Sequence, residues 1–260
     1  MNTFLLKSYF KFLLNSSNEH GVHSPFVYDL ISKCFYDKTK FEEYKQLKSY
    51  RSNLLKSKNT ISVEDFGAGS KVFKSNKRKI SDLAKVAGAS KSESELLFRI
   101  VKYFNPKSIL ELGTSMAIST NTMNNAAKDA KISTVEGSKS IFEWNSTNTK
   151  KYNFENTIFV NSLFDNYLET LSSDKIFDFI YIDGNHTYDA TIKYFNILKN
   201  HIHKDSVIIF DDIHWSEGMD KAWNEIVENT DISLSIDTFH FGMVFFRTEQ
   251  YNKEHFIIRI

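Results

Sequence analysis

The stretch SILELGTSMAIS, residues 108–119, decides the fold of this chain. Its first five residues form the short apolar run of a buried β-strand, and a helical pattern starts at about residue 117. Gly113 stands between the two, and a glycine lets the backbone approach a ligand closely where a helix presents free N–H groups. A lone glycine is also common in a plain turn into a helix, so its interpretation depends on the rest of the chain.

Short apolar runs alternate with helical segments from residue 92 onward. The runs predict strands at 108–112, 132–136, 157–160, 177–183, 206–212, 234–237 and 242–247. Helices are predicted at about 93–104, 117–129, 139–151, 164–171, 187–200 and 217–228. This alternation predicts a Rossmann-like, doubly wound α/β fold with a mostly parallel sheet. Only residues 238–241 separate the last two runs, so the last of the seven strands should pair antiparallel.

The first third of the chain has a different pattern. We expect an N-terminal helical cap with an exposed loop over residues 1–90, and the α/β domain over residues 91–260. Residues 1–14 are interpreted as an amphipathic helix rather than a signal peptide, because Lys7 and Lys11 interrupt the apolar run.

Two further features shape the expected cap. Ser24 and Pro25 are typical of a helix N-cap and first turn, so a helix is predicted over residues 26–35. Apolar periodicity fades over residues 49–79 while lysine and serine become frequent. An exposed loop is therefore expected there.

Composition excludes several classes of protein. The chain has 260 residues, of which 41% are hydrophobic and 15% aromatic, as in folded globular domains. Its formal charge is +1, so we expect neither a nucleic-acid partner nor a membrane partner. The single cysteine, Cys34, excludes an intramolecular disulfide. No run approaches the roughly 18 apolar residues of a membrane span, which favours a cytoplasmic location. The oligomeric state is not indicated.

Acidic residues follow the first two strands in a defined order. In open α/β sheets, ligands bind outside the carboxyl ends of the strands. Glu111 lies near the end of the first strand, Gly113 follows it, and Glu136 ends the second strand. A carboxylate at this second position can accept hydrogen bonds from both hydroxyls of a ribose. Only one glycine is present, so the dinucleotide fingerprint is not satisfied.

These motifs resemble a known family. ILELGTSMAIST (109–120), TVEG (134–137) and FDFIYIDGNHTYD (177–189) look like class I S-adenosylmethionine-dependent methyltransferases, in the branch related to catechol O-methyltransferase. HGVHSPFVYDLI (20–31), with the segment 65–81, looks like the N-terminal region of a group of bacterial methyltransferases. The first resemblance covers roughly residues 92–248. It implies a seven-stranded sheet with an antiparallel last strand, and S-adenosylmethionine as the cofactor.

The resemblance also implies a set of cofactor-binding residues. Glu136 would bind the ribose hydroxyls, Ser119 would lie near the cofactor's carboxylate, and Ser162 near its adenine. The complete set is Glu111, Gly113, Thr114, Ser115, Ser119, Glu136, Gly137, Ser162 and Asp183.

Two features depart from this pattern. Relatives often have glycine where this chain has Ala117, and alanine permits close approach provided that its φ stays negative. The segment Asp65-Phe-Gly67-Ala-Gly69-Ser70 looks more like a glycine loop than the loop at Gly113 does. However, neither an amphipathic helix nor an acid-ended strand follows it at the expected distance. We therefore favour the loop at Gly113.

Ionisable residues after the fourth and fifth strands are the catalytic candidates. His186 stands three residues after Asp183, the spacing at which relatives carry a basic residue. Imidazole titrates near neutral pH, so His186 is the best candidate for a general base. His214, after the fifth strand, is a second candidate. His186 could instead be a structural loop residue bonded to Asp189 or to the backbone.

Asp183, Asp211 and Asp212 form a candidate Mg²⁺ site, because Mg²⁺ prefers carboxylate and water oxygens. Metal-dependent relatives use two aspartates and an asparagine, and Asp212 stands in the asparagine position here. The alternative is that Asp183 caps a helix and that Asp211 or Asp212 orients a histidine.

We therefore expect methyl transfer from S-adenosylmethionine to a hydroxyl of a small-molecule acceptor, with His186 as the base. Two alternatives remain at this point. One is a nicotinamide-dependent oxidoreductase, which would share the acid after the second strand. The other is a noncatalytic binding module on the same fold.

Overall fold

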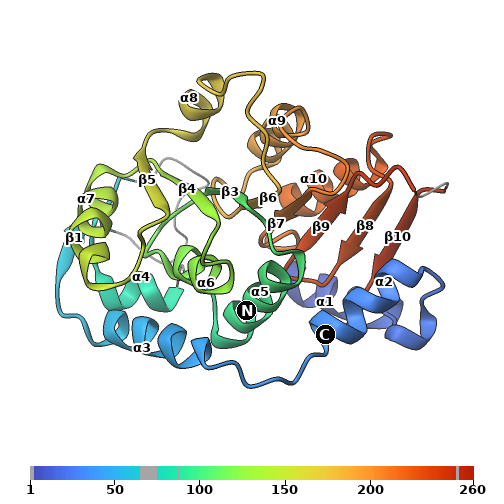
Figure 1. Cartoon of the computed structure of the whole chain (residues 1–260), viewed down its shortest axis with the longest axis horizontal. Helices are drawn as coiled ribbons and strands as arrows, with labels where there is room; N and C mark the ends of the chain where they lie inside the picture. The colour runs from blue at the N-terminus through green and yellow to red at the C-terminus, as the bar shows by residue number, and fades with distance from the viewer. Residues whose placement is uncertain (1–2, 65–74, 87, 250–251) are drawn as a thin grey trace. The chain divides into compact units, whose positions relative to one another are not determined.

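The computed structural model describes residues 3–64, 75–86, 88–249 and 252–260. The chain forms two compact units (Figure 1): unit 1 is Met1–Asp37 with Leu171–Ile260, and unit 2 is Lys38–Thr170. The domain boundary expected at residue 90 stays a prediction. The glycine-rich segment 65–70 lies outside the described residues.

Three strands of unit 2 run parallel: β3 (Ser108–Leu112), β4 (Lys131–Glu136) and β5 (Thr157–Asn161). β4 lies between the other two, with Ile132 beside Ile109 of β3 and Val135 beside Val160 of β5. β-branched side chains such as these favour strands because they pack well on a pleated surface. The first three predicted strands are confirmed to within one residue.

The helices that precede and follow these strands also match the expected alternation. They are α5 (Lys91–Phe104), α6 (Ile118–Ala126), α7 (Lys139–Asn148), the short 3₁₀-helix η3 (Thr149–Lys151) and α8 (Phe164–Glu169). Ser90 and Glu93 form a capping box at the start of α5. The helix ends at Phe104, and its C-cap, Asn105, has a φ of 45° and precedes Pro106.

The start of unit 2 differs from the prediction. The region from Ser49 was expected to be a loop, but it begins inside α3 (Glu43–Lys56). Leu47, Tyr50 and Leu54 form the buried face of this helix, three or four residues apart. Lysine, serine and asparagine between them mask the apolar period. A short antiparallel pair, β1 (Thr60–Ser62) and β2 (Lys77–Lys79), then leads to α4 (Ile80–Val86).

Unit 1 holds five strands among its described residues: β6 (Phe179–Ile182), β7 (Val207–Phe210), β8 (Leu234–Asp237), β9 (Gly242–Phe245) and β10 (Glu254–Ile257). They lie in the order β10, β8, β9, β7, β6. β9 runs antiparallel to both of its neighbours, while β6 pairs parallel with β7 and β10 with β8. The mostly parallel α/β fold and the antiparallel seventh strand are thus confirmed.

A glycine makes room for the insertion of β9. A Cβ at Gly242 would lie 2.6 Å from the indole ring of Trp223, which is only 2% exposed. Because an indole in the core cannot move aside, any larger residue at this position would displace the ring or the strand.

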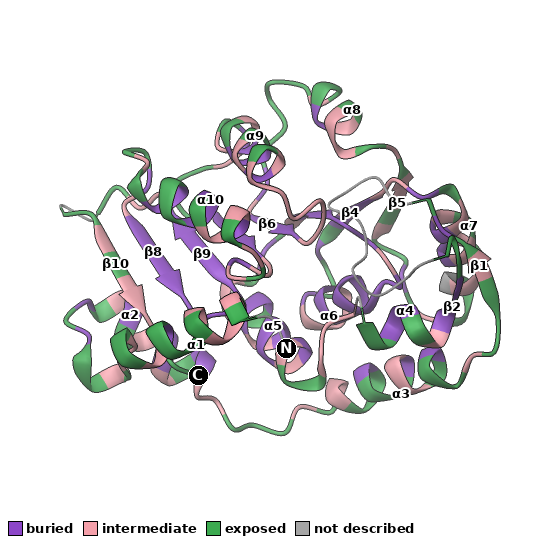
Figure 2. Cartoon of the chain, turned by 180° about the vertical axis from the view of Figure 1, so that it is seen from behind, coloured by how far each residue is buried: buried purple, intermediate pink, exposed green. Residues whose placement is uncertain are grey.

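Helices complete unit 1. They are α1 (Thr3–Asn15), the 3₁₀-turn η1 (Glu19–Gly21), α2 (Pro25–Leu30), its π-helical extension η2 (Ile31–Phe35), α9 (Tyr188–Leu198) and α10 (Glu217–Glu228). The predicted N-terminal helix and the start of α2, with Ser24 as N-cap and Pro25 in the first turn, are confirmed. Every residue of β6, β7, β8 and β9 is buried (Figure 2), so both faces of these strands are covered.

The sequence did not predict β10. Its Glu-His-Phe-Ile stretch is short and partly exposed, and it has two polar residues at one end. It forms the edge of the unit 1 strands beside β8.

None of the helices in the described ranges is long and apolar enough to cross a membrane.

Candidate functional site

The loop between β3 and α6, residues 113–117, has an unusual backbone. Gly113, Ser115 and Ala117 have φ values of 110°, 44° and 53°. The condition of a negative φ at Ala117 is therefore not met. Ala117 is the N-cap of α6 in a left-handed conformation, and its N–H closes a turn on the carbonyl oxygen of Thr114 at 2.7 Å. Left-handed backbone is costly for residues with a Cβ, so the surroundings must hold it in place.

Glu111 is fully buried at the centre of a cluster of hydroxyl groups. Ser119 donates to Oε1 at 2.5 Å, while Thr120 and Thr134 donate to Oε2 at 2.5 and 2.6 Å. The hydroxyls of Thr114 and Thr134 lie 2.6 Å apart. Hydrogen bonds to an ionised carboxylate are the strong ones. The cluster therefore ties the loop and α6 to β3 and β4, and it brings three predicted site residues, Glu111, Thr114 and Ser119, together.

Glu136 links the end of β4 to the same loop. Its Oε2 accepts a hydrogen bond from the N–H of Ser115 at 3.0 Å, and its Oε1 from the N–H of Ser138 at 2.8 Å. The side chain is partly exposed, whereas that of Glu111 is not. Of the two predicted acids, Glu136 is thus the one at the surface of unit 2.

The end of β5 lies beside Glu136. Ser162 donates its N–H to the carbonyl oxygen of Glu136 at 3.1 Å. The Asn161 side chain donates to the carbonyl oxygens of Glu136, at 2.9 Å, and Gly137, at 3.3 Å. Three more predicted cofactor residues, Glu136, Gly137 and Ser162, are thereby adjacent. The Ser162 hydroxyl itself donates to the carbonyl oxygen of Leu163.

Two residues that the sequence did not indicate contact the loop. The Tyr50 hydroxyl of α3 donates to the carbonyl oxygen of Met116, and the Asn145 side chain of α7 donates to that of Ser115. Tyr50 lies in the lysine-rich segment whose helical period is masked, and Asn145 has no motif. Only an i, i+3, i+7 count over Leu47, Tyr50 and Leu54 would have indicated that Tyr50 is buried.

In unit 1, Asp183 and His186 form a pair in the loop between β6 and α9. His186 Nε2 lies 3.5 Å from Asp183 Oδ1, and the two side chains are 23% and 20% exposed. Burial lowers the pKa of His186, but the hydrogen bond and charge of Asp183, with the charge of Asp212, outweigh it and raise the pKa above its usual value. His186 is therefore a half-buried imidazole that gains a proton readily.

Asn185 shapes this loop. It has a φ of 50°, and its side-chain nitrogen lies 3.0 Å from the Tyr194 hydroxyl of α9. Asparagine tolerates the left-handed region better than most residues. The bond to α9 fixes the loop one residue before His186.

Asp211 and Asp212 follow β7. Asp211 Oδ2 accepts the hydroxyl proton of Tyr181 at 2.7 Å, and Oδ1 accepts the N–H of Asp212 at 2.9 Å. Asp212 has a φ of 54°. In the described part of the chain, no three His, Cys, Asp or Glu side chains are close enough to hold one metal ion. The three aspartates therefore do not fit the predicted Mg²⁺ site.

His214 has a different environment from His186. Its Nδ1 lies 2.7 Å from Asp220 and its Nε2 2.8 Å from Asp237, so both ring nitrogens face carboxylates. Phe239 stacks on the ring at 5.3 Å between centroids. Burial lowers the pKa of His214, but the two hydrogen bonds and charges outweigh it and raise the pKa to about 9. A histidine that is protonated at neutral pH and bonded at both nitrogens is poorly suited to act as a base.

The His214 triad should make stability depend on pH. Because its pKa is raised from about 6.5 to about 9 on folding, the stabilisation is complete below pH 6.5 and is lost as pH rises through 9. We expect the free energy of unfolding to fall by about 2–3 kcal/mol over this range. Urea unfolding of the wild type and of His214→Gln at several pH values measures it. Equal pH slopes in the two proteins would contradict this assignment.

Four aromatic residues that follow or lie between the strands of unit 1 differ in their exposure. Trp223 and Phe239 are buried, at 2% and 7% exposure. Trp215 is 38% exposed, and the hydroxyl of Tyr188 donates to Glu225 of α10. Only Trp215 and Tyr188 therefore remain candidates for contact with a ligand.

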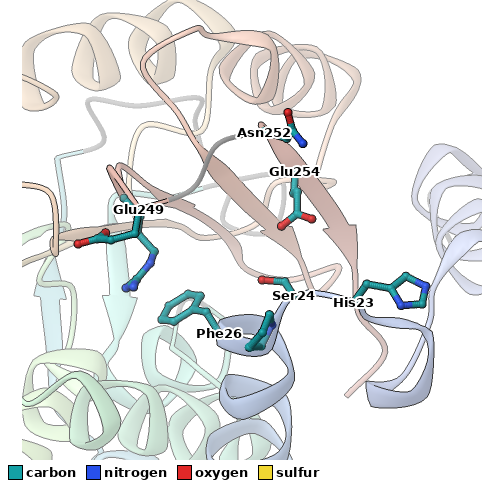
Figure 3. A pocket seen from close by; sticks show the side chains of 8 residues that line it. His23, Ser24, Phe26, Glu249, Asn252 and Glu254 are labelled. Carbon is teal, nitrogen blue, oxygen red and sulfur yellow. The ribbon is translucent and has the colours of Figure 1, made fainter.

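Unit 1 also has an open cavity of about 530 Å³, away from the predicted site residues. Figure 3 shows Ser24 and Phe26 at the start of α2 on one side of it and Glu254 of β10 on the other. The Arg247 guanidinium lies 4.2 Å from the centroid of the Phe26 ring. Glu249 at its rim pairs with Lys204 at 2.7 Å. The lining thus includes one guanidinium group, of Arg247, and two carboxylates, of Glu249 and Glu254.

Comparisons with known proteins agree with this arrangement. Residues 110–213 match the model of a family described as a methyltransferase domain. No curated protein sequence matches the chain significantly.

Solved structures share the fold over most of the chain. The S-adenosylhomocysteine-bound methyltransferase of Podospora anserina is 17% identical, with a TM-score of 0.57 over 81% of this chain and 99% of the other. The Bacillus cereus O-methyltransferase, also bound to S-adenosylhomocysteine, is 16% identical, with a TM-score of 0.56 over 81% and 94%. The S-adenosylmethionine-bound O-methyltransferase of tomaymycin synthesis from Streptomyces achromogenes is 14% identical, with a TM-score of 0.56 over 80% and 91%.

The matched residues run from within β3 to just past β7, so they include the loop, Glu136, His186 and both aspartates after β7. Residues 110–213 are therefore similar to a methyltransferase domain, and the chain shares its fold with solved O-methyltransferases.

Proposed function

We propose that this protein transfers the methyl group of S-adenosylmethionine to a hydroxyl of a small-molecule acceptor. The observation that carries the proposal is the pairing of Glu136 with the strained loop at Ser115, at the carboxyl ends of β3 and β4. In α/β folds this edge of the sheet is where ligands bind. The methyltransferase domain match covers the same residues.

The residues of unit 2 fit such a cofactor. Gly113, with a φ of 110° and no Cβ, permits close approach of the backbone. Glu136 would accept hydrogen bonds from the ribose hydroxyls, and Gly137 and Ser162 would lie along the adenine. Ser115, as part of the 113–117 loop, would also contact the cofactor. The buried cluster of Glu111, Thr114 and Ser119 would support the loop from behind.

When bound, S-adenosylmethionine supplies a methyl carbon activated by a sulfonium. The protein's task is to hold the acceptor in line with that carbon and to remove the hydroxyl proton. We assign the proton removal to His186, whose imidazole would take the hydroxyl proton as the acceptor oxygen gains the methyl group and the sulfur–methyl bond breaks, which leaves S-adenosylhomocysteine. Asp183 would orient the ring and stabilise the imidazolium, as the 3.5 Å pair permits.

His214 and the metal are left out of this mechanism for physical reasons. Both nitrogens of His214 face carboxylates, so we assign it a structural role. Asp183, Asp211 and Asp212 do not lie close enough together to bind one metal ion, so we assign no role to Mg²⁺. Membership of the branch related to catechol O-methyltransferase rests on the sequence resemblance alone.

Replacing Glu136 tests the cofactor site. Glu136→Ala removes two bonds to backbone N–H groups and the acceptor for the ribose, so S-adenosylhomocysteine should bind about 100-fold more weakly. Isothermal titration calorimetry measures the affinity. Glu143→Ala, on the exposed side of α7, is the matched control and should bind as the wild type does. Unchanged affinity in a folded Glu136→Ala protein would contradict the assignment.

A further inference from the structure

Two successive carbonyl groups of the 113–117 loop are held by side chains from different helices. Tyr50 Oη of α3 donates to the carbonyl oxygen of Met116 at 2.9 Å. Asn145 Nδ2 of α7 donates to the carbonyl oxygen of Ser115 at 2.8 Å. Glu136 of β4 accepts a hydrogen bond from the N–H of Ser115 at 3.0 Å. The peptide groups on both sides of Met116 are thus fixed by groups outside the loop.

These contacts coincide with the strained part of the loop. Ser115 and Ala117, on either side of Met116, both have positive φ, although each has a Cβ. Such residues relax to other conformations unless the surrounding structure determines them. The hydrogen bonds to Ser115 and Met116 act on the two peptide groups whose rotation would release that conformation.

Both side chains are buried in a way that suits a fixed donor. Tyr50 is 3% exposed and packs in a buried apolar cluster with Met116, Ala117 and Ile118. Burial raises the pKa of Tyr50 far above its ordinary value, so the hydroxyl keeps its proton and remains a donor. A buried hydroxyl or amide bond is costly to lose because its partner carbonyl is then left unpaired.

Asn145 gives an independent observation. It is 1% exposed, and within the described structure its Oδ1 is buried with no hydrogen-bond partner. An unsatisfied amide oxygen destabilises the fold, and an apolar side chain of the same size would avoid that penalty. The contribution of Asn145 must therefore lie in its Nδ2, which binds the carbonyl oxygen of Ser115.

We propose that Tyr50 and Asn145 are positioning residues that hold the 113–117 loop in its cofactor-binding conformation. The inference rests on the proposed function, since it assigns these residues to the same cofactor site. Neither residue needs to touch the cofactor. Without either bond the loop would populate relaxed conformations, and the observed affinity would fall with the fraction of protein that remains competent.

Single substitutions measure this effect. Tyr50→Phe and Asn145→Leu each remove one donor at nearly constant volume, and each should weaken binding of S-adenosylhomocysteine by about tenfold in calorimetry. Tyr152→Phe and Asn148→Leu are the matched controls. The Tyr152 ring packs on that of Tyr50, and Asn148 bonds within its own helix α7. Both controls should bind as the wild type does.

A rescue variant separates positioning from a general loss of packing. Ser115→Gly removes the Cβ that makes a φ of 44° costly, so the loop then depends less on the hydrogen bonds from Tyr50 and Asn145. Combined with Tyr50→Phe, it should restore the affinity to within about twofold of that of Ser115→Gly alone. If the affinity loss of the double variant equals the product of the losses in Tyr50→Phe and Ser115→Gly, positioning through the loop is refuted.

Hydrogen exchange gives a readout that needs no cofactor. In the free protein, the amides of residues 115–119 should exchange about tenfold faster in Tyr50→Phe and Asn145→Leu than in the wild type, while β3 is unchanged. If the wild type binds S-adenosylhomocysteine and both variants keep its affinity and its exchange rates, the positioning role of Tyr50 and Asn145 is overturned, while the proposed function stands. Absence of binding by the wild type would overturn the proposed function, and with it the positioning role of Tyr50 and Asn145.

Discussion

Replacing His186 with alanine should reduce methyl transfer by about 10²- to 10⁴-fold, the usual contribution of a positioned general base. S-adenosylhomocysteine should bind the variant within about twofold of the wild type, because Glu136, Gly137 and Ser162, which are proposed to bind it, lie outside the loop that carries His186. Turnover with a labelled methyl donor and calorimetry on the same preparation measure the two quantities. A smaller loss of turnover, or a parallel loss of affinity, would remove His186 from the mechanism.

The exposed pair of His203 and Asp178, 2.9 Å apart in the same unit, offers the matched control. His203→Ala removes a similar imidazole–carboxylate contact and should leave turnover unchanged. The pH profile adds a second readout. A base must be neutral to accept a proton, and Asp183 and Asp212 raise the pKa of His186, so activity should rise with pH through a value above 6.5.

Replacing Glu111 with alanine should lower the free energy of unfolding by about 2–4 kcal/mol. The change leaves the hydroxyls of Ser119, Thr120 and Thr134 without their shared acceptor and creates a cavity in a site with no exposure. In a chain of this size the midpoint temperature should fall by about 5–10 °C. Thermal unfolding followed by circular dichroism measures it.

Glu111→Gln sharpens the same test. Glutamine keeps the volume but has one acceptor oxygen and an amide that must donate, so it should lose about half as much stability. Glu155→Ala, at an exposed position, should change the midpoint by less than about 2 °C. If Glu111→Ala were as stable as Glu155→Ala, the hydroxyl cluster around Glu111 would contribute nothing to the free energy of unfolding.

Much of the fold follows from short-range pattern. The strands and helices from Ser108 to Phe245 were predictable because buried runs and helical periods are local properties of the sequence. The antiparallel seventh strand followed from the short connection between β8 and β9. What pattern missed was decided by tertiary context: α3 has only three buried apolar positions, and β10 depends on the edge of β8 for its pairing.

The candidate site was predictable in its acids but not in its backbone. Glu111 and Glu136 were found from their positions in the strand order. Their different environments, one buried among hydroxyls and one at the surface, depend on which side chains lie above each strand end. The left-handed Ala117 and the contribution of Tyr50 arise from long-range contacts, which no local signal in a single sequence encodes.

Titration of the wild-type protein with S-adenosylmethionine, and separately with NAD, tests the central claim most directly. The account predicts saturable binding of S-adenosylmethionine at micromolar concentrations, with no binding of NAD, because the loop at Gly113 lacks the second and third glycines of a dinucleotide loop. Binding of NAD without binding of S-adenosylmethionine at high micromolar concentration would contradict it.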